Sequence, residues 1–140
     1  MTAEGTAPRR TRFGLRAAPW LLWFGVVGAG TAWSLHTLVD WGLDETVCRS
    51  GHDDVAGLPL KAVLVVLTVA FLAVAVASTA AAWVLWRRLD RSDPDEPVEG
   101  LRQNRASFMA VVGFVGGLLF SLIIVMSLVG VLVFPVCEYA

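Results

Sequence analysis

Four residues whose side chains can do chemistry lie in or beside the long apolar runs of this 140-residue chain. His36 and Asp40 are four residues apart, so a helix presents both on one face, one turn from each other. Ionisable residues within a membrane span are costly and are candidates for function by default. Cys48 and Cys137 are the only two cysteines. Ligand binding, proton transfer and thiol chemistry are therefore the possibilities that the sequence raises.

Three interpretations of the His36 and Asp40 pair stay open. The pair can be structural, satisfied by its own contact, by water, or by the indoles of Trp33 and Trp41. It can be a site on which a partner protein docks, or it can supply ligands to a cofactor or metal. A proton relay across the membrane is not supported. Both groups lie in the C-terminal half of the first apolar run, and the other two apolar runs carry no ionisable side chain.

Metal and haem sites lack their usual ligand patterns. His36 is the only histidine in an apolar run, which excludes two-histidine haem ligation within one chain. A haem held by His36 and Met126 is conceivable, because Met126 is expected at a depth in the membrane similar to that of His36. Soft ligands for Cu(I) could come from His36, Cys48, His52 and Cys137, but no CxxC, HxxxM or methionine cluster organises them. Nucleophile–base pairs, phosphate-cradling glycine loops and paired catalytic carboxylates are also missing. The sequence predicts no metal, no cofactor and no enzyme.

The elements that position these residues are three long apolar runs in a chain that is 56% hydrophobic. About 20 apolar residues cross a bilayer as a helix, and in lipid the backbone must satisfy its own hydrogen bonds. We predict helices at about 19–43, 62–86 and 106–134 within a transmembrane domain over 19–136. The fold class is an all-α, three-transmembrane-helix bundle in a bilayer. No soluble domain or nucleic-acid-binding region remains.

Basic residues predict the orientation of this bundle. Nine of the 11 fall in the N-terminal tail (1–18) and the linker (87–105), and two fall in the acidic loop (44–61). Short loops rich in Lys and Arg stay in the cytoplasm. We expect a flexible basic tail and a linker inside, with the acidic loop and a short tail (137–140) outside. A cleaved signal peptide is the rival reading, since a basic start, an apolar run and "GAGTA" imitate one.

The two cysteines then share the outer compartment. An even pair on an oxidising face predicts a disulfide between Cys48 and Cys137, which would tie the end of helix three to the first loop. Two unrelated thiols, or a metal role, remain the alternatives.

Small residues predict which helix faces meet. On helix one a stripe of small residues leads to the polar pair, and helices two and three carry stripes of their own; such stripes let helices approach closely. We therefore expect His36 and Asp40 to face the interior of the bundle. The stripes are Gly25, Ala29 and Ala32 on helix one, Ala70, Ala73, Ala77 and Ala81 on helix two, and Gly113, Gly117 and Ser121 on helix three.

A family resemblance adds a functional expectation. "WFGVVGAGTAW" opens helix one, "VCRSG" follows it, and helix three ends on "VFPVC". This resembles small uncharacterised bacterial inner-membrane proteins that accompany components of cytochrome c oxidase, a haem–copper oxidase. The resemblance implies that Cys48 and Cys137 are characteristic positions, and it carries no catalytic residues.

We therefore expect a multi-pass protein of the bacterial cytoplasmic (inner) membrane that is a non-enzymatic accessory or assembly subunit. Its expected partner is a larger integral membrane complex, with a respiratory terminal oxidase foremost. The alternatives are an outer-face protein that binds or transfers copper or haem, and a membrane thiol–disulfide redox protein. The wide separation of the cysteines argues against the last of these, because redox enzymes use closely spaced pairs.

Overall fold

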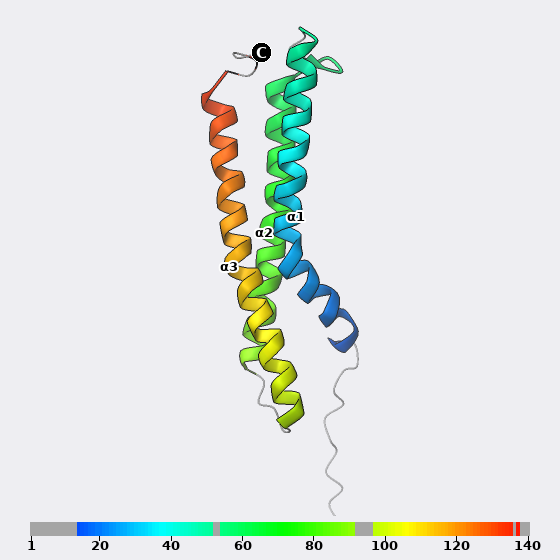
Figure 1. The fold of residues 1–140 in the computed structure, drawn as a ribbon, viewed down its shortest axis with the longest axis vertical. Coiled ribbons are helices and arrows are strands. Elements are labelled where there is room, and N and C mark those ends of the chain that lie inside the picture. Colours follow the sequence, from blue (N-terminus) through cyan, green and yellow to red (C-terminus); the bar gives the residue numbers. More distant parts are fainter. Residues whose placement is uncertain (1–13, 52–53, 92–96, 136, 138–140) are drawn as a thin grey trace, which may run out of the picture.

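The computed structural model describes residues 14–51, 54–91, 97–135 and 137 of the chain. Three long helices dominate this part: α1 (Gly14–Arg49), α2 (Leu60–Asp90) and α3 (Pro97–Val133) (Figure 1). A small antiparallel hairpin, β1 (Asp54–Val55) and β2 (Leu58–Pro59), joins α1 to α2. The predicted all-α architecture of three long helices is confirmed. Much of the predicted tail, the centre of the linker and the last three residues lie outside the described residues.

Each of the three helices contains a segment long and apolar enough to cross a membrane. The segments are Trp20–Arg49, Leu60–Asp90 and Gln103–Val133, of 30, 31 and 31 residues. At 1.5 Å per residue they are roughly 45 Å long, which exceeds the roughly 30 Å hydrocarbon core of a bilayer. Their ends therefore reach the headgroup region or the helices tilt.

Helix α1 extends six residues beyond its predicted end at 43, so that the first part of the predicted loop 44–61 is helical. Local bonds explain the extension. The guanidinium of Arg49 pairs with Glu45 at 2.9 Å, and the hydroxyl of Thr46 donates to the carbonyl oxygen of Gly42 at 2.7 Å. The helix stops where Gly51 adopts a φ of 69°, a backbone conformation that ends many helices.

Helix α3 begins nine residues before its predicted start at 106. Pro97 is the first helical residue, a position where proline's missing N–H costs nothing. The sequence analysis placed this segment in the linker 87–105 and did not predict a helix start at Pro97. The amide of Gln103, inside the extension, donates to the backbone oxygen of Leu89 near the end of α2 at 2.7 Å.

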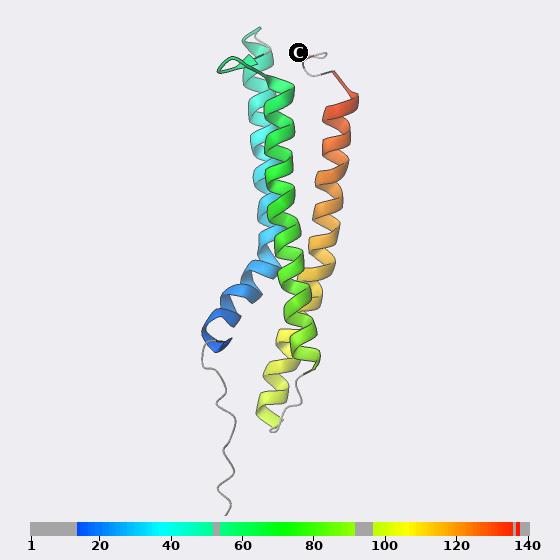
Figure 2. The ribbon, with the colours of Figure 1, turned by 180° about the vertical axis from the view of Figure 1, so that it is seen from behind.

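The three helices lie side by side, but the N-terminal part of α1, blue in Figures 1 and 2, bends away from the bundle. Ser78 of α2 explains where the bend begins. Its hydroxyl donates to the carbonyl oxygen of Phe24 at 2.7 Å and approaches that of Gly25 at 3.4 Å. A side chain inserted into the backbone hydrogen-bond ladder is a known cause of helix bending.

The helices meet most closely at glycines. A Cβ on Gly113 of α3 would lie 2.7 Å from the carbonyl oxygen of Gly25 on α1, and a Cβ on Gly117 would collide with the hydroxyl of Thr79 on α2. Close backbone approach of this kind drives helix association in lipid, where burial of apolar surface contributes little. The small-residue stripes predicted for α1 and α3 therefore lie at the contact.

The stripe predicted for α2 does not. Ala70, Ala73 and Ala77 are exposed and Ala81 is only partly buried. The buried face of α2 instead comprises Leu60, Leu64, Thr68, Ala75, Ser78, Thr79, Ala82 and Leu85. A hydroxyl in a span is better placed against another helix, where it finds a hydrogen-bond partner, and three of these buried residues are Thr68, Ser78 and Thr79.

A small apolar core and two polar caps hold the bundle. Ala29, Ala32, Ala75 and Ile124 form the core, flanked by aromatic rings. The ammonium of Lys61, at the start of α2, donates to the backbone oxygen of Leu132 near the end of α3 at 2.9 Å. A cation placed there also complements the negative end of the helix dipole. Together with the Gln103 bond, it joins α2 and α3 at both ends.

Candidate functional site

The polar centre of the bundle is a contact between α1 and α2 built on His36. The side chain is 3% exposed, and its Nε2 atom lies 2.9 Å from Oδ2 of Asp40 and 3.0 Å from Oγ1 of Thr68. The ring meets Phe71 edge-on, with 5.9 Å between ring centroids. The predicted inward orientation of His36 and Asp40 matches this arrangement, and α2 is the helix that His36 faces.

The hydrogen bonds determine where the imidazole carries a proton. The hydroxyl of Thr68 donates to the backbone oxygen of Leu64 at 2.8 Å, so Oγ1 has no proton left for His36 and must accept. A carboxylate oxygen of Asp40 also accepts. Nε2 therefore bears a hydrogen that it shares between Asp40 and Thr68. In this arrangement Nε2 cannot ligate a metal or a haem iron.

Asp40 is satisfied on one side only. Its side chain is 18% exposed, and Oδ2 accepts from His36. Oδ1 is shielded from solvent and has no hydrogen-bond partner among the described residues. The Oγ atom of Ser121 on α3 is also shielded from solvent and has no hydrogen-bond partner among the described residues.

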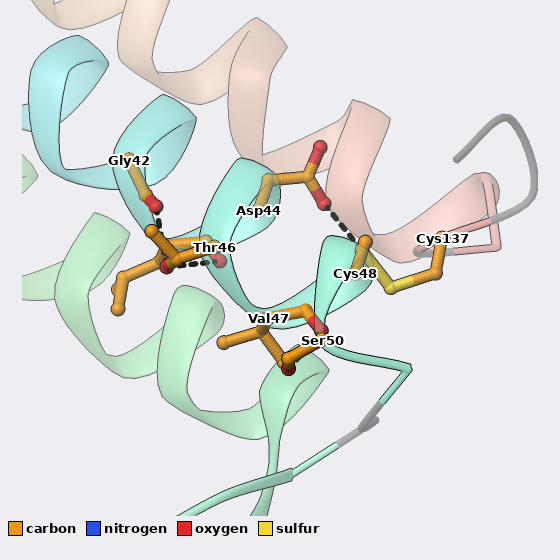
Figure 3. Close-up of a disulfide and its surroundings, with 8 residues drawn as sticks. Gly42, Asp44, Thr46, Val47, Cys48, Ser50 and Cys137 are labelled. Carbon is orange, nitrogen blue, oxygen red and sulfur yellow. Dashed lines mark hydrogen bonds between the residues drawn. A yellow bond between two sulfur atoms is a disulfide. The ribbon is translucent and has the colours of Figure 1, made fainter.

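A disulfide joins Cys48 and Cys137, 89 residues apart in sequence, with 5.3 Å between Cα atoms (Figure 3). Cys48 belongs to the last turn of α1, not to the loop that the sequence predicted, so the bond ties α1 to the chain just beyond α3. Oδ1 of Asp44, one turn earlier, approaches Sγ of Cys48 to 3.3 Å. The end of the bundle that carries this bond is called the disulfide end below.

Asp44, Cys48 and Cys137 place one ligand-type atom each within 4.8 Å of one another. Metals bind thiolates, and a disulfide sulfur is a poor donor. The trio therefore cannot serve as a copper centre while the disulfide is intact. His52, the other residue considered for copper, lies outside the described residues.

Met126 and His36 do not share a site. Met126 is 58% exposed on α3, whereas His36 is buried against Thr68 and Phe71 of α2. The His/Met haem hypothesis has no geometric basis in the described residues.

Sequence reasoning missed Thr68, Lys61 and Asp44. Thr68 could have been found, because it falls on the face of α2 that a 3.6-residue period places with Ser78 and Thr79. Lys61 and Asp44 lie near helix ends, where charged residues are common and carry no distinguishing pattern.

Comparison with protein-family models, curated proteins and solved structures finds no match for this chain. What the fold and the site define is therefore the class alone: an α-helical protein with three potential membrane spans, braced by a disulfide.

Proposed function

We propose that the chain is a non-enzymatic accessory subunit of the bacterial inner membrane that packs against a larger integral membrane complex. The supporting observation is the use made of the polar side chains within the bundle. His36 and Thr68 join α1 to α2, and Ser78 also holds α2 to α1. These groups fix helices to one another, and this use of them supports a structural role in contact with a partner rather than turnover of a substrate.

The outer surface is suited to such contact. Large apolar side chains cover all three helices, and the tryptophans on the bent part of α1 are among the most exposed, with Trp20 at 81% and Trp23 at 57%. Lipid or another membrane helix can cover this surface at similar cost. In the proposed orientation the N-terminus and the linker lie in the cytoplasm and the disulfide end lies outside, as the nine-to-two distribution of basic residues indicates.

A respiratory terminal oxidase is the proposed partner, on the strength of the family resemblance. Purification of the tagged chain from native membranes in a mild detergent tests both parts of the proposal. We expect an integral membrane partner in constant ratio, and the haem absorption spectrum of an oxidase in the same fractions. An unrelated three-span protein with the same tag is the control.

Three outcomes are distinct. A constant membrane partner without haem keeps the accessory role and excludes the oxidase. Recovery of the chain alone, or with the same proteins as the control, contradicts the accessory role. Stoichiometric copper in the purified chain, lost on mutation of Cys48, would favour the alternative of outer-face copper binding.

A further inference from the structure

An open apolar groove of about 330 Å³ runs between α2 and α3. Helix α2 lines it with residues that include Val76, Ala80 and Trp83, and α3 with residues that include Phe114 and Leu118. No described residue of α1 takes part, so the groove opens sideways, toward the lipid that would surround these helices in a bilayer. A ligand that enters it therefore comes from the membrane.

The walls of this groove are fixed by contacts between the two helices themselves. Thr79, which also lines the groove, lies so close to Gly117 of α3 that a Cβ on the glycine would collide with its hydroxyl. Toward the linker, the amide of Gln103 donates to the backbone oxygen of Leu89 and joins the same two helices. A site that is formed beforehand binds without the cost of ordering its own parts.

A cation stands at one end of the groove. The guanidinium of Arg87 lies over the ring of Trp83, 4.5 Å from its centroid, and Trp83 packs in turn on Phe114 with 4.8 Å between ring centroids. This contact uses the face of the guanidinium, whereas its N–H donors point outward in its plane. Within the described part of the chain these donors have no acceptor, and Asp90, one turn further along α2, forms no ion pair with Arg87. The guanidinium is thus held in place with its donors open to an anion.

The length of the groove matches one leaflet of a bilayer. Arg87 follows Val76 by eleven residues, which is roughly 16 Å along a helix. That is about half of the roughly 30 Å hydrocarbon core. Trp83 and Trp86, whose rings lie 5.1 Å apart, are of the residue type enriched where the hydrocarbon meets the headgroups. The apolar wall therefore covers the depth of one leaflet, with the guanidinium at the level of the headgroups.

We propose that this groove binds one acyl chain of an anionic phospholipid, whose phosphate accepts hydrogen bonds from Arg87. Apolar wall, aromatic ring and cation follow one another in the order in which a phospholipid presents its chain, glycerol and phosphate. Arginine binds phosphate through paired N–H groups, and basic pockets between membrane helices recognise anionic headgroups. A zwitterionic lipid carries its own ammonium, which competes with Arg87 for the phosphate. The site belongs to the isolated chain and does not depend on the proposed partner complex.

The test measures the unfolding temperature of the purified full chain in mixed micelles of a non-ionic detergent, as the mole fraction of dioleoyl-phosphatidylglycerol rises. Dioleoyl-phosphatidylethanolamine has the same chains without the net charge, and glycerol 3-phosphate has the phosphate without the chains. We expect a saturable rise in temperature with phosphatidylglycerol, a smaller rise with phosphatidylethanolamine and none with glycerol 3-phosphate.

Two matched pairs of variants test the cation and the groove separately. Arg87→Gln removes the phosphate donor, whereas Arg105→Gln removes an exposed arginine nine residues from Phe114, on the opposite side of α3. Ala80→Phe fills the groove, whereas Ala77→Phe adds the same ring at an exposed position of α2 outside it. We expect the half-saturating lipid fraction to rise at least about tenfold for Arg87→Gln and Ala80→Phe and to stay unchanged for their controls.

The proposal is overturned if phosphatidylethanolamine acts as strongly as phosphatidylglycerol, or if glycerol 3-phosphate alone reproduces the rise. It also fails if Arg105→Gln weakens binding as much as Arg87→Gln, because the lipid would then be attracted by diffuse charge. Binding to Ala80→Phe that equals binding to the unmodified chain would remove the acyl chain from the groove. Because the cation and the groove have separate pairs, loss of folding in one variant leaves the other pair decisive.

Discussion

Replacing Gly113 with alanine tests whether backbone contact between α1 and α3 holds the bundle together. The new Cβ would lie 2.7 Å from the carbonyl oxygen of Gly25 and 3.1 Å from the Cα of Val26. Ordinary contacts begin at about 3.5 Å, so α3 would have to retreat by roughly 0.8 Å, the difference between 3.5 and 2.7. Backbone atoms cannot turn aside as a side chain can, so the helices must separate.

The magnitude follows from two opposing effects. A gap of about 0.5–1 Å removes a quarter to a half of the dispersion energy of each contact across the interface, and overpacked substitutions cost about 1–3 kcal/mol. Alanine is a better helix former than glycine by roughly 0.8–1 kcal/mol. We expect Gly113→Ala to lower the free energy of unfolding by up to about 2 kcal/mol after the helix-forming gain.

Gly116, three residues away on the same helix, provides the matched control. A Cβ there meets nothing within 4 Å, so alanine brings only the helix-forming gain and stability should rise by up to about 1 kcal/mol. Gly117→Ala should fall between the two, because its Cβ meets the side chain of Thr79, which can rotate at the cost of its bond to Ala75.

The assay is unfolding by a denaturing detergent, followed by far-ultraviolet circular dichroism in mixed micelles. The expected order of stability is Gly116→Ala, then the unmodified chain, then Gly117→Ala, then Gly113→Ala. If Gly113→Ala is as stable as Gly116→Ala, the contact of α3 with the backbone of α1 does not hold the bundle, and the reasoning fails.

Three further predictions use the same purified chain or intact cells. In a variant lacking both native cysteines, Asn104→Cys should react with impermeant thiol reagents only after the cells are permeabilised; labelling of intact cells would reverse the proposed orientation. Non-reducing mass spectrometry should find Cys48 and Cys137 in one intramolecular link, and two free thiols in protein from an oxidising compartment would exclude it. Thr68→Val keeps the shape but removes an acceptor of the His36 hydrogen, so it should lower stability by about 0.6–1.7 kcal/mol; an unchanged stability would mean that this bond does not join α1 to α2.

The inner face of α1 was predictable from sequence for a physical reason. Gly25, Ala29, Ala32 and His36 are all buried, as the stripe implied. Glycine and an ionisable side chain each have a strong reason to avoid lipid, because one permits close backbone approach and the other is costly to expose. Where two such signals fall on one face of a membrane helix, they predict that this face packs against the neighbouring helices.

The inner face of α2 lacked those signals. Alanine recurs on every side of α2, so the regular spacing of Ala70, Ala73 and Ala77 did not single out one face. The helix ends themselves depended on local bonds such as Arg49 to Glu45, which a hydropathy pattern does not register.

The two caps between α2 and α3 have a mechanical consequence. Lys61 reaches from α2 to Leu132, and Gln103 reaches from α3 to Leu89, at opposite ends of the pair. Sliding of one helix along the other by a single turn, about 5.4 Å, would break both bonds at once. The α2–α3 hairpin therefore behaves as one stiff strut. Neither bond involves the N-terminal part of α1, so we expect the angle of its bend to vary more than the register of α2 and α3.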